Sequence, residues 1–68
     1  MKLSARNVLA GKVLKVADGA VNTEVTLDVA GVKIVSIITR ESAKALKLKK
    51  GAKAYAVVKA SEVMIGVD

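Results

Sequence analysis

The sequence predicts an all-β domain that contains one short helix. Apolar and polar residues alternate with a period of two in residues 21–29, as in a strand with one buried face. Glycine-containing turn pairs separate the apolar runs, and the one segment rich in helix formers lies between the third and fourth runs. Five strands with a helix at that place, in the order β-β-β-α-β-β, are typical of a small OB-like five-stranded barrel.

The first three strands are predicted from apolar runs and the turns between them. The first strand, residues 7–17, has apolar side chains on both faces, and Asp18-Gly19 is a strong hairpin turn signal after it. The second strand, residues 21–29, alternates cleanly and ends at the turn Ala30-Gly31. The third, residues 32–39, is again apolar on both faces, which indicates cover on both sides. In so small a domain, we expect another subunit to supply the second cover.

One helix and two further strands complete the predicted order. The helix covers residues 40–46, where Thr39 is a suitable N-cap and Ala43 and Ala45 favour helix. Gly51 ends this excursion, because glycine readily adopts the left-handed conformation that follows many helices. The last two strands are predicted over residues 52–60 and 62–67.

Composition predicts one small domain that associates with itself. The 68 residues fit a single domain, residues 1–68, near the lower size limit for an independent core. The chain is 53% hydrophobic and has neither Cys nor His, so it cannot use disulfides or ordinary zinc sites as staples. We therefore expect an obligate homo-oligomer. No apolar run approaches a membrane span and no signal core is present, which predicts a soluble cytoplasmic protein without a membrane partner.

The residue types also limit the function. Without His or Cys, the usual general base and thiol nucleophile are missing, and the six carboxylates form no evident acid–base pair, so no enzyme is predicted. The formal charge of +6 attracts anions of any kind. One alternative is an OB-like nucleic-acid-binding module, although Tyr55 is its only aromatic residue for stacking bases. Another alternative is a purely structural oligomerisation module.

Three short clusters share one chemistry: hydroxyls, backbone N–H groups and fixed positive charge. They are Ser4 to Asn7, Thr39 to Ser42, and Lys59 to Ser61. Taken singly, each is better explained as structure, namely a mobile end with an incidental arginine, an ordinary helix cap, and a turn with one solvated lysine. Together they could hold a small oxyanion through donors alone, provided that they meet in space. Because all ligands would be donors, no metal ion would be bound directly.

Several motifs resemble the molbindins, the stand-alone Mop family of molybdate-binding proteins. The resemblance covers essentially the whole chain and is most specific in its two ends. The matching stretches are Ser4-Ala5-Arg6-Asn7 with Leu9 and Gly11, Glu24-Val25-Thr26-Leu27-Asp28, Ser36-Ile37-Ile38-Thr39 with Ser42, residues 46–51, and Val58-Lys59-Ala60-Ser61-Glu62-Val63-Met64.

This resemblance implies a cytoplasmic OB-like barrel that assembles as a trimer of dimers, a homohexamer. It implies storage of molybdate or tungstate at subunit interfaces, with no catalysis, no organic cofactor and no nucleic-acid partner. Residue by residue, the implied molybdate-binding groups of one subunit are Ser4, Arg6, Lys59 and the backbone around Ala60, and those of its neighbour are Thr39 and Ser42. Asn7 and Ser61 match the motif as well and are carried over with them.

Overall fold

A computed structural model describes residues 1–68, the whole chain. Its elements are β1 (Asn7–Asp18), β2 (Asn22–Val29), β3 (Val32–Thr39), α1 (Arg40–Ala45), β4 (Lys53–Val58) and the 3-10 turn η1 (Ala60–Glu62). The predicted all-β class, with one short helix between the third and fourth strands, is confirmed. The helix is one residue shorter than predicted, and no helix has the length and hydropathy needed to cross a bilayer.

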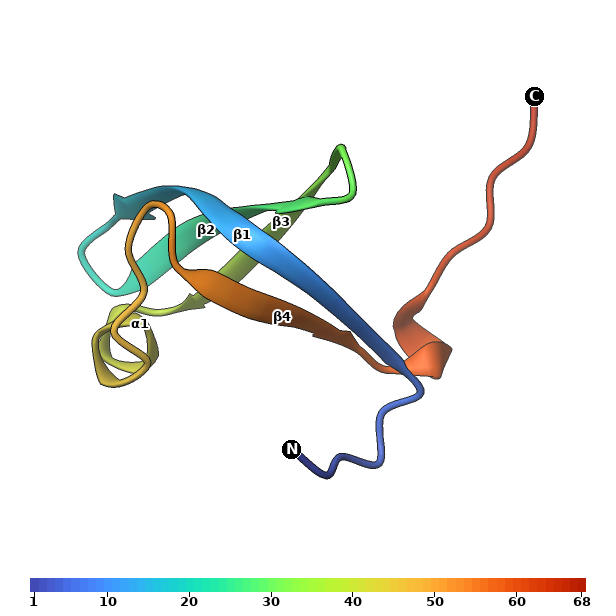
Figure 1. Cartoon of the computed structure of the whole chain (residues 1–68), viewed down its shortest axis with the longest axis horizontal. Helices are drawn as coiled ribbons and strands as arrows, with labels where there is room; N and C mark the ends of the chain where they lie inside the picture. The colour runs from blue at the N-terminus through green and yellow to red at the C-terminus, as the bar shows by residue number, and fades with distance from the viewer.

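The four strands form one antiparallel sheet in the order β3-β2-β1-β4 (Figure 1). The 12-residue strand β1 pairs with β4 along its first half and with β2 along its second half. Lys12 belongs to both ladders, opposite Asp28 on one side and Lys53 on the other. The register shifts between Val13 and Lys15, and such bulges bend a strand and increase its twist. The sheet is therefore curved, with one concave and one convex face.

The small core lies on this concave face. Val13, Val25 and Leu27 are 1–4% exposed, and side chains of β3, β4 and the loop after α1 pack against them. Alternation along β2 explains the choice of residues, because Thr23, Val25 and Leu27 share the inward face. Thr23 is fully buried, and its hydroxyl donates to Asp18 Oδ1 at 2.7 Å. Only five of the 68 residues are buried, so a single chain hides little of its apolar surface.

The loop between α1 and β4 is bound to the sheet by backbone hydrogen bonds. Gly51 donates to the Val13 carbonyl at 2.8 Å, and Val13 donates to the Ala52 carbonyl at 2.9 Å. Gly51 has a φ of 90°, a conformation that glycine adopts without a steric penalty. The prediction that Gly51 ends the helical segment is therefore wrong: α1 ends at Ala45, the left-handed residue that follows it is Lys47 with a φ of 54°, and Gly51 turns the chain into β4.

The fifth strand predicted over residues 62–67 is absent from the single chain. β4 ends at Val58 instead of continuing to residue 60, because Ala60–Glu62 form η1. After η1 the chain runs away from the sheet as an arm (Figure 1), so residues 63–68 have no strand to pair with. Consequently β3 and β4 are both edge strands, and the sheet does not close into a barrel.

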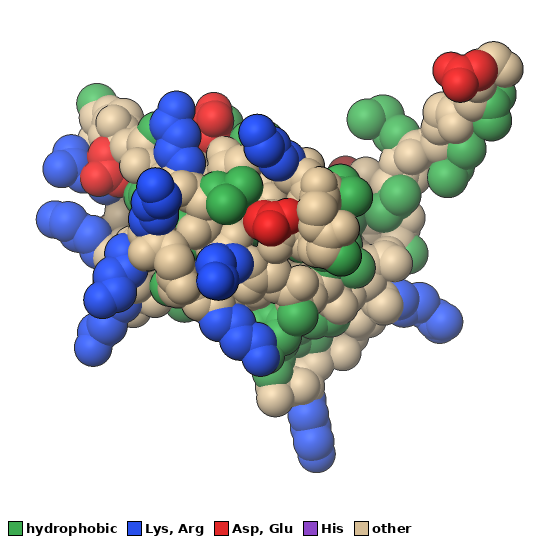
Figure 2. Space-filling view, turned by 45° about the horizontal axis from the view of Figure 1, so that its top comes forward, with side chains coloured by type: hydrophobic (Ala, Val, Ile, Leu, Met, Phe, Trp, Pro, Cys, Tyr) green, Lys and Arg blue, Asp and Glu red, His purple; other side chains and the backbone are tan.

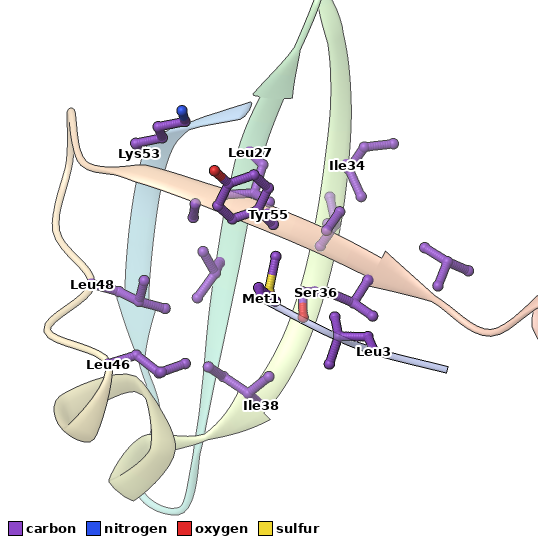
Figure 3. A pocket seen from close by; sticks show the side chains of 16 residues that line it. Met1, Leu3, Leu27, Ile34, Ser36, Ile38, Leu46, Leu48, Lys53 and Tyr55 are labelled. Carbon is purple, nitrogen blue, oxygen red and sulfur yellow. The ribbon is translucent and has the colours of Figure 1, made fainter. Parts of the chain in front are cut away.

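The curved sheet also carries an open apolar groove. This cavity, of about 690 Å³, lies between β3 and β4, and 14 of its 16 lining residues are hydrophobic. Figure 3 shows Ile34 of β3 at the upper right, Ile38 of β3 at the bottom, Tyr55 of β4 in the upper part, and Met1 and Leu3 near the centre. The C-terminal arm is also apolar (Figure 2), with Ile65 87% and Val67 93% exposed. The chain thus exposes both an apolar groove and an apolar strand-like segment.

Replacement of Gly11 by alanine should destabilise the fold. An added Cβ would lie 2.7 Å from the Asp28 carbonyl oxygen and 2.9 Å from a Val29 methyl group, where β1 passes between its two ladders. Such overpacking costs roughly 1–3 kcal/mol. We expect Gly11→Ala to lower the free energy of unfolding by that amount in chemical denaturation. Ala10→Ser, which adds one atom at the exposed neighbouring position, should change the free energy of unfolding little. If the two variants unfolded with the same free energy, the close approach of Gly11 to Asp28 would be contradicted.

Candidate anion-binding site

A second cavity, of about 500 Å³, lies where β1 begins and β4 ends. It is shallow and open, and it is lined by two short segments from opposite ends of the chain together with one residue of β4. The lining residues are Ser4, Ala5, Arg6, Val57, Lys59, Ala60 and Ser61. Two of the three clusters predicted from the sequence therefore face the same space.

The pairing of β1 with β4 brings these segments together. Asn7, the first residue of β1, is paired with Val58, the last residue of β4. The chain before Asn7 and the chain after Val58 leave the sheet from this one rung, so Ser4 to Arg6 and Lys59 to Ser61 must start side by side. Asn7 strengthens the rung, because its side-chain Nδ2 donates to the Val58 carbonyl at 3.2 Å. Asn7 itself does not line the cavity.

The groups that line the cavity are donors and cations. Ser4 and Ser61 bring hydroxyls, Arg6 a planar guanidinium with five N–H donors, and Lys59 an ammonium. Lys59 holds the N-cap position of η1 in an extended conformation, so the N–H groups of Ala60 and Ser61 belong to the first turn. No carboxylate lines the cavity. These hydroxyl, guanidinium, ammonium and backbone N–H groups can together donate hydrogen bonds to an anion whose oxygens all accept them.

The third cluster, Thr39 with Ser42, lies elsewhere. Thr39 is the N-cap of α1, and its Oγ1 accepts from the Ser42 backbone N–H at 3.0 Å and donates to Ser42 Oγ at 2.8 Å. Both side chains are exposed. Figure 1 places α1 at the opposite end of the molecule from η1, and neither residue lines the cavity. One chain therefore carries two separated groups of donors, which do not meet within it.

Val57 is the lining residue that sequence reasoning missed. It is 46% exposed and borders the cavity from the outer face of β4. The signal was available, because Val57 lies two residues before Lys59 and alternate residues of a strand share a face. An apolar wall beside the charged groups lowers the local dielectric, which strengthens their hydrogen bonds to a bound anion.

The side chains that usually coordinate metal ions do not cluster in this structure. No group of three or more His, Cys, Asp or Glu side chains gathers anywhere in residues 1–68. The side chains that do gather are hydrogen-bond donors, so the cavity is suited to the oxygens of an oxyanion and not to a bare cation.

Comparison with known proteins gives one consistent result. Residues 3–65 match the model of the TOBE domain. The chain is 50% identical over 66 residues to molybdenum-pterin-binding protein 2 of Clostridium pasteurianum, covering 96% of this chain and 97% of that protein. A molybdate-binding protein from Sporomusa ovata superposes with a TM-score of 0.94 at 36% identity, over 98% of this chain and 100% of that one.

A third match is to a longer protein. The cytoplasmic molybdate-binding protein ModG, in a crystal form with molybdate bound, superposes with a TM-score of 0.95 at 51% identity. The match covers 100% of this chain and 49% of the ModG chain.

Loss of the Thr39 hydroxyl should weaken the helix cap. Thr39→Val keeps the shape of the side chain but removes the acceptor for the Ser42 N–H, and loss of an N-cap costs about 1 kcal/mol. We expect the melting temperature, measured in oxyanion-free buffer, to fall by roughly 4–8 °C, as for a domain of this size. Thr39→Ser retains the hydroxyl and serves as the control. If the two variants melted together, the hydroxyl would not stabilise α1.

Proposed function

Because this chain belongs to the Mop family of molybdate-binding proteins, which carry the TOBE domain, we propose that it binds molybdate at subunit interfaces as an intracellular store. The function is binding without catalysis. The observation that carries the proposal is the cavity in which two segments, joined by a hydrogen bond across 51 residues of sequence, present only donors and positive charge.

The chemistry of the cavity matches molybdate. This ion is a doubly charged tetrahedron whose four oxygens accept hydrogen bonds and carry no proton at neutral pH. A protonated oxyanion such as phosphate would need an acceptor as well, and no carboxylate lines the cavity. Each charge-assisted hydrogen bond contributes about 1.5–3 kcal/mol where it is shielded from water. Tungstate has the same charge and shape and a similar size, so we include it as a second ligand, whereas sulfate is a smaller dianion that would fit such a site less well.

The site is divided between two subunits. One subunit supplies Ser4, Arg6, Lys59, and the N–H groups of Ala60 and Ser61, which already line one cavity. A neighbour supplies the hydroxyls of Thr39 and Ser42, which the fold places far from that cavity. Closing the open side of the cavity with the neighbour would remove water and strengthen every hydrogen bond inside.

Assembly also accounts for the missing fifth strand. Val63, Ile65 and Val67 would share one face of an extended segment, and all three are 47–93% exposed in the single chain. The groove between the free edges of β3 and β4 is apolar and open, with Met1 and Leu3 of the same chain among its lining residues. We propose that the arm of one copy lies in the groove of another, so that each five-stranded OB-like barrel is completed in trans. A trimer of dimers, located in the cytoplasm, is the proposed assembly.

No observation favours the nucleic-acid alternative. Tyr55, the chain's single aromatic residue, is half-exposed beside the groove, with the Lys53 ammonium 5.5 Å from its ring centroid. One ring provides no series of stacking platforms for successive bases.

Calorimetric titration tests both the function and the role of Arg6. Wild-type protein should bind molybdate and tungstate tightly and sulfate weakly. Arg6→Ala should weaken molybdate binding by about 10- to 100-fold, because it removes one charge-assisted, bidentate donor. Lys33→Ala on the exposed face of β3 is the control that removes the same charge elsewhere. Native mass spectrometry should give the same subunit count for all three proteins.

Two outcomes would count against this function. Equal and weak heats for molybdate, tungstate and sulfate in the wild type would reject the oxyanion store. An unchanged affinity in Arg6→Ala would reject the N-terminal segment as part of the site.

The proposed strand exchange can be tested by cross-linking, because the chain contains no natural cysteine. Ser36→Cys places a thiol in the groove, and Ile65→Cys places one on the apolar face of the arm. Oxidation of the double variant should give covalent multimers on a non-reducing gel, whereas either single variant should not. A disulfide within one chain would show that the arm folds back on its own groove, and no disulfide at all would show that it lies elsewhere.

A further inference from the structure

The side chain of Asn7 stands at the junction on which the cavity is built. Asn7 is half-buried and begins β1, whereas Arg6, one residue earlier, is exposed and lines the cavity. Its amide Nδ2 donates to the Val58 carbonyl at 3.2 Å, and Val58 is the last residue of β4. Lys59, the next residue, already lines the cavity. This hydrogen bond therefore joins the two segments immediately before they separate.

The chemistry of the amide favours this structural bond over contact with an anion. One amide proton is directed to the Val58 carbonyl. The second amide proton remains a possible donor, but the amide oxygen is an acceptor, which a dianion would repel. The residue also lies outside the set that lines the cavity. Asn7 thus shares a motif with the proposed ligands but occupies a different place.

We propose that Asn7 is a positioning residue, whose side-chain bond to Val58 sets the spacing between the Ser4–Arg6 and Lys59–Ser61 segments before the oxyanion arrives. This inference rests on the proposed function. Both segments lie outside regular strands, so the last rung of the ladder is the restraint closest to them. A site whose donors are already spaced for the ligand loses less conformational entropy on binding, which raises affinity.

Asn7→Leu tests the proposal, because leucine has a similar size and cannot donate. We expect molybdate affinity to fall about three- to tenfold, as for loss of one neutral hydrogen bond. In the anion-free protein, we expect faster amide hydrogen exchange at Glu62, whose N–H donates to the Lys59 carbonyl and so reports the order of residues 59–62. The subunit count should stay that of the wild type, and the melting temperature should fall by a few degrees, as for loss of one hydrogen bond. Asn7→Ala provides a second variant should leucine perturb folding. Thr26→Val, a change from polar to apolar at a half-buried position of β2, is the control.

The outcomes separate three roles for Asn7. Weaker binding together with faster exchange in the anion-free segment supports positioning. Weaker binding with unchanged exchange would mean that Asn7 contacts the oxyanion directly, which overturns the proposal. A lower melting temperature with unchanged affinity would reduce it to a stabilising contact and also overturns it.

The experiment also distinguishes this inference from the proposed function. If wild-type protein binds no molybdate, the proposed function fails, yet the exchange measurement still shows whether Asn7 orders residues 59–62. If the wild type binds and both Asn7 variants bind equally well, only the positioning role is rejected.

Discussion

The antiparallel pairing of β1 with β4 is the interaction on which the rest of the structure depends. It adds β4 to the sheet as an edge strand, and its final rung, Asn7 with Val58, determines where both ends of the chain leave the sheet. Gly11 and the register shift after Val13 let the same long strand serve β4 first and β2 afterwards. The β4 ladder occupies residues 7–12, before this register shift, and it is this ladder that places the donors of the cavity side by side.

Local patterns were sufficient to predict most of the elements. Strict alternation in β2, the turn at Ala30-Gly31 and the Thr39 cap are short-range features, and the structure has them where the sequence indicated. Ala30 and Gly31 both have positive φ, as a tight hairpin turn requires. The convergence of Ser4 to Arg6 with Lys59 to Ser61 was different, because strand register between segments 51 residues apart leaves no local signal.

The predicted fifth strand fails for an instructive reason. Residues 62–67 are rich in apolar residues that favour a strand, but a strand needs an edge to pair with, and η1 directs this arm away from the edges of its own sheet. The sequence pattern of a segment indicates that it can form a strand, but it does not indicate which strand, in the same chain or in another copy, pairs with it. The same limit applies to Thr39 and Ser42: their capping role is local and was predicted from the sequence, whereas their proposed role as ligands rests on the proposed assembly.

In the proposed assembly, the polar surface of each chain binds the anion, and the apolar surfaces hold the chains together. The cavity gathers Arg6 and Lys59 with no compensating carboxylate, and every chain carries a formal charge of +6. Before an oxyanion binds, these charges oppose the approach of another copy. The force that holds the empty assembly must come from apolar burial, for which the groove between β3 and β4 and the arm with Ile65 and Val67 are suited. A bound dianion then cancels the repulsion, so that ligand binding adds to the stability of an assembly that apolar contacts have already formed.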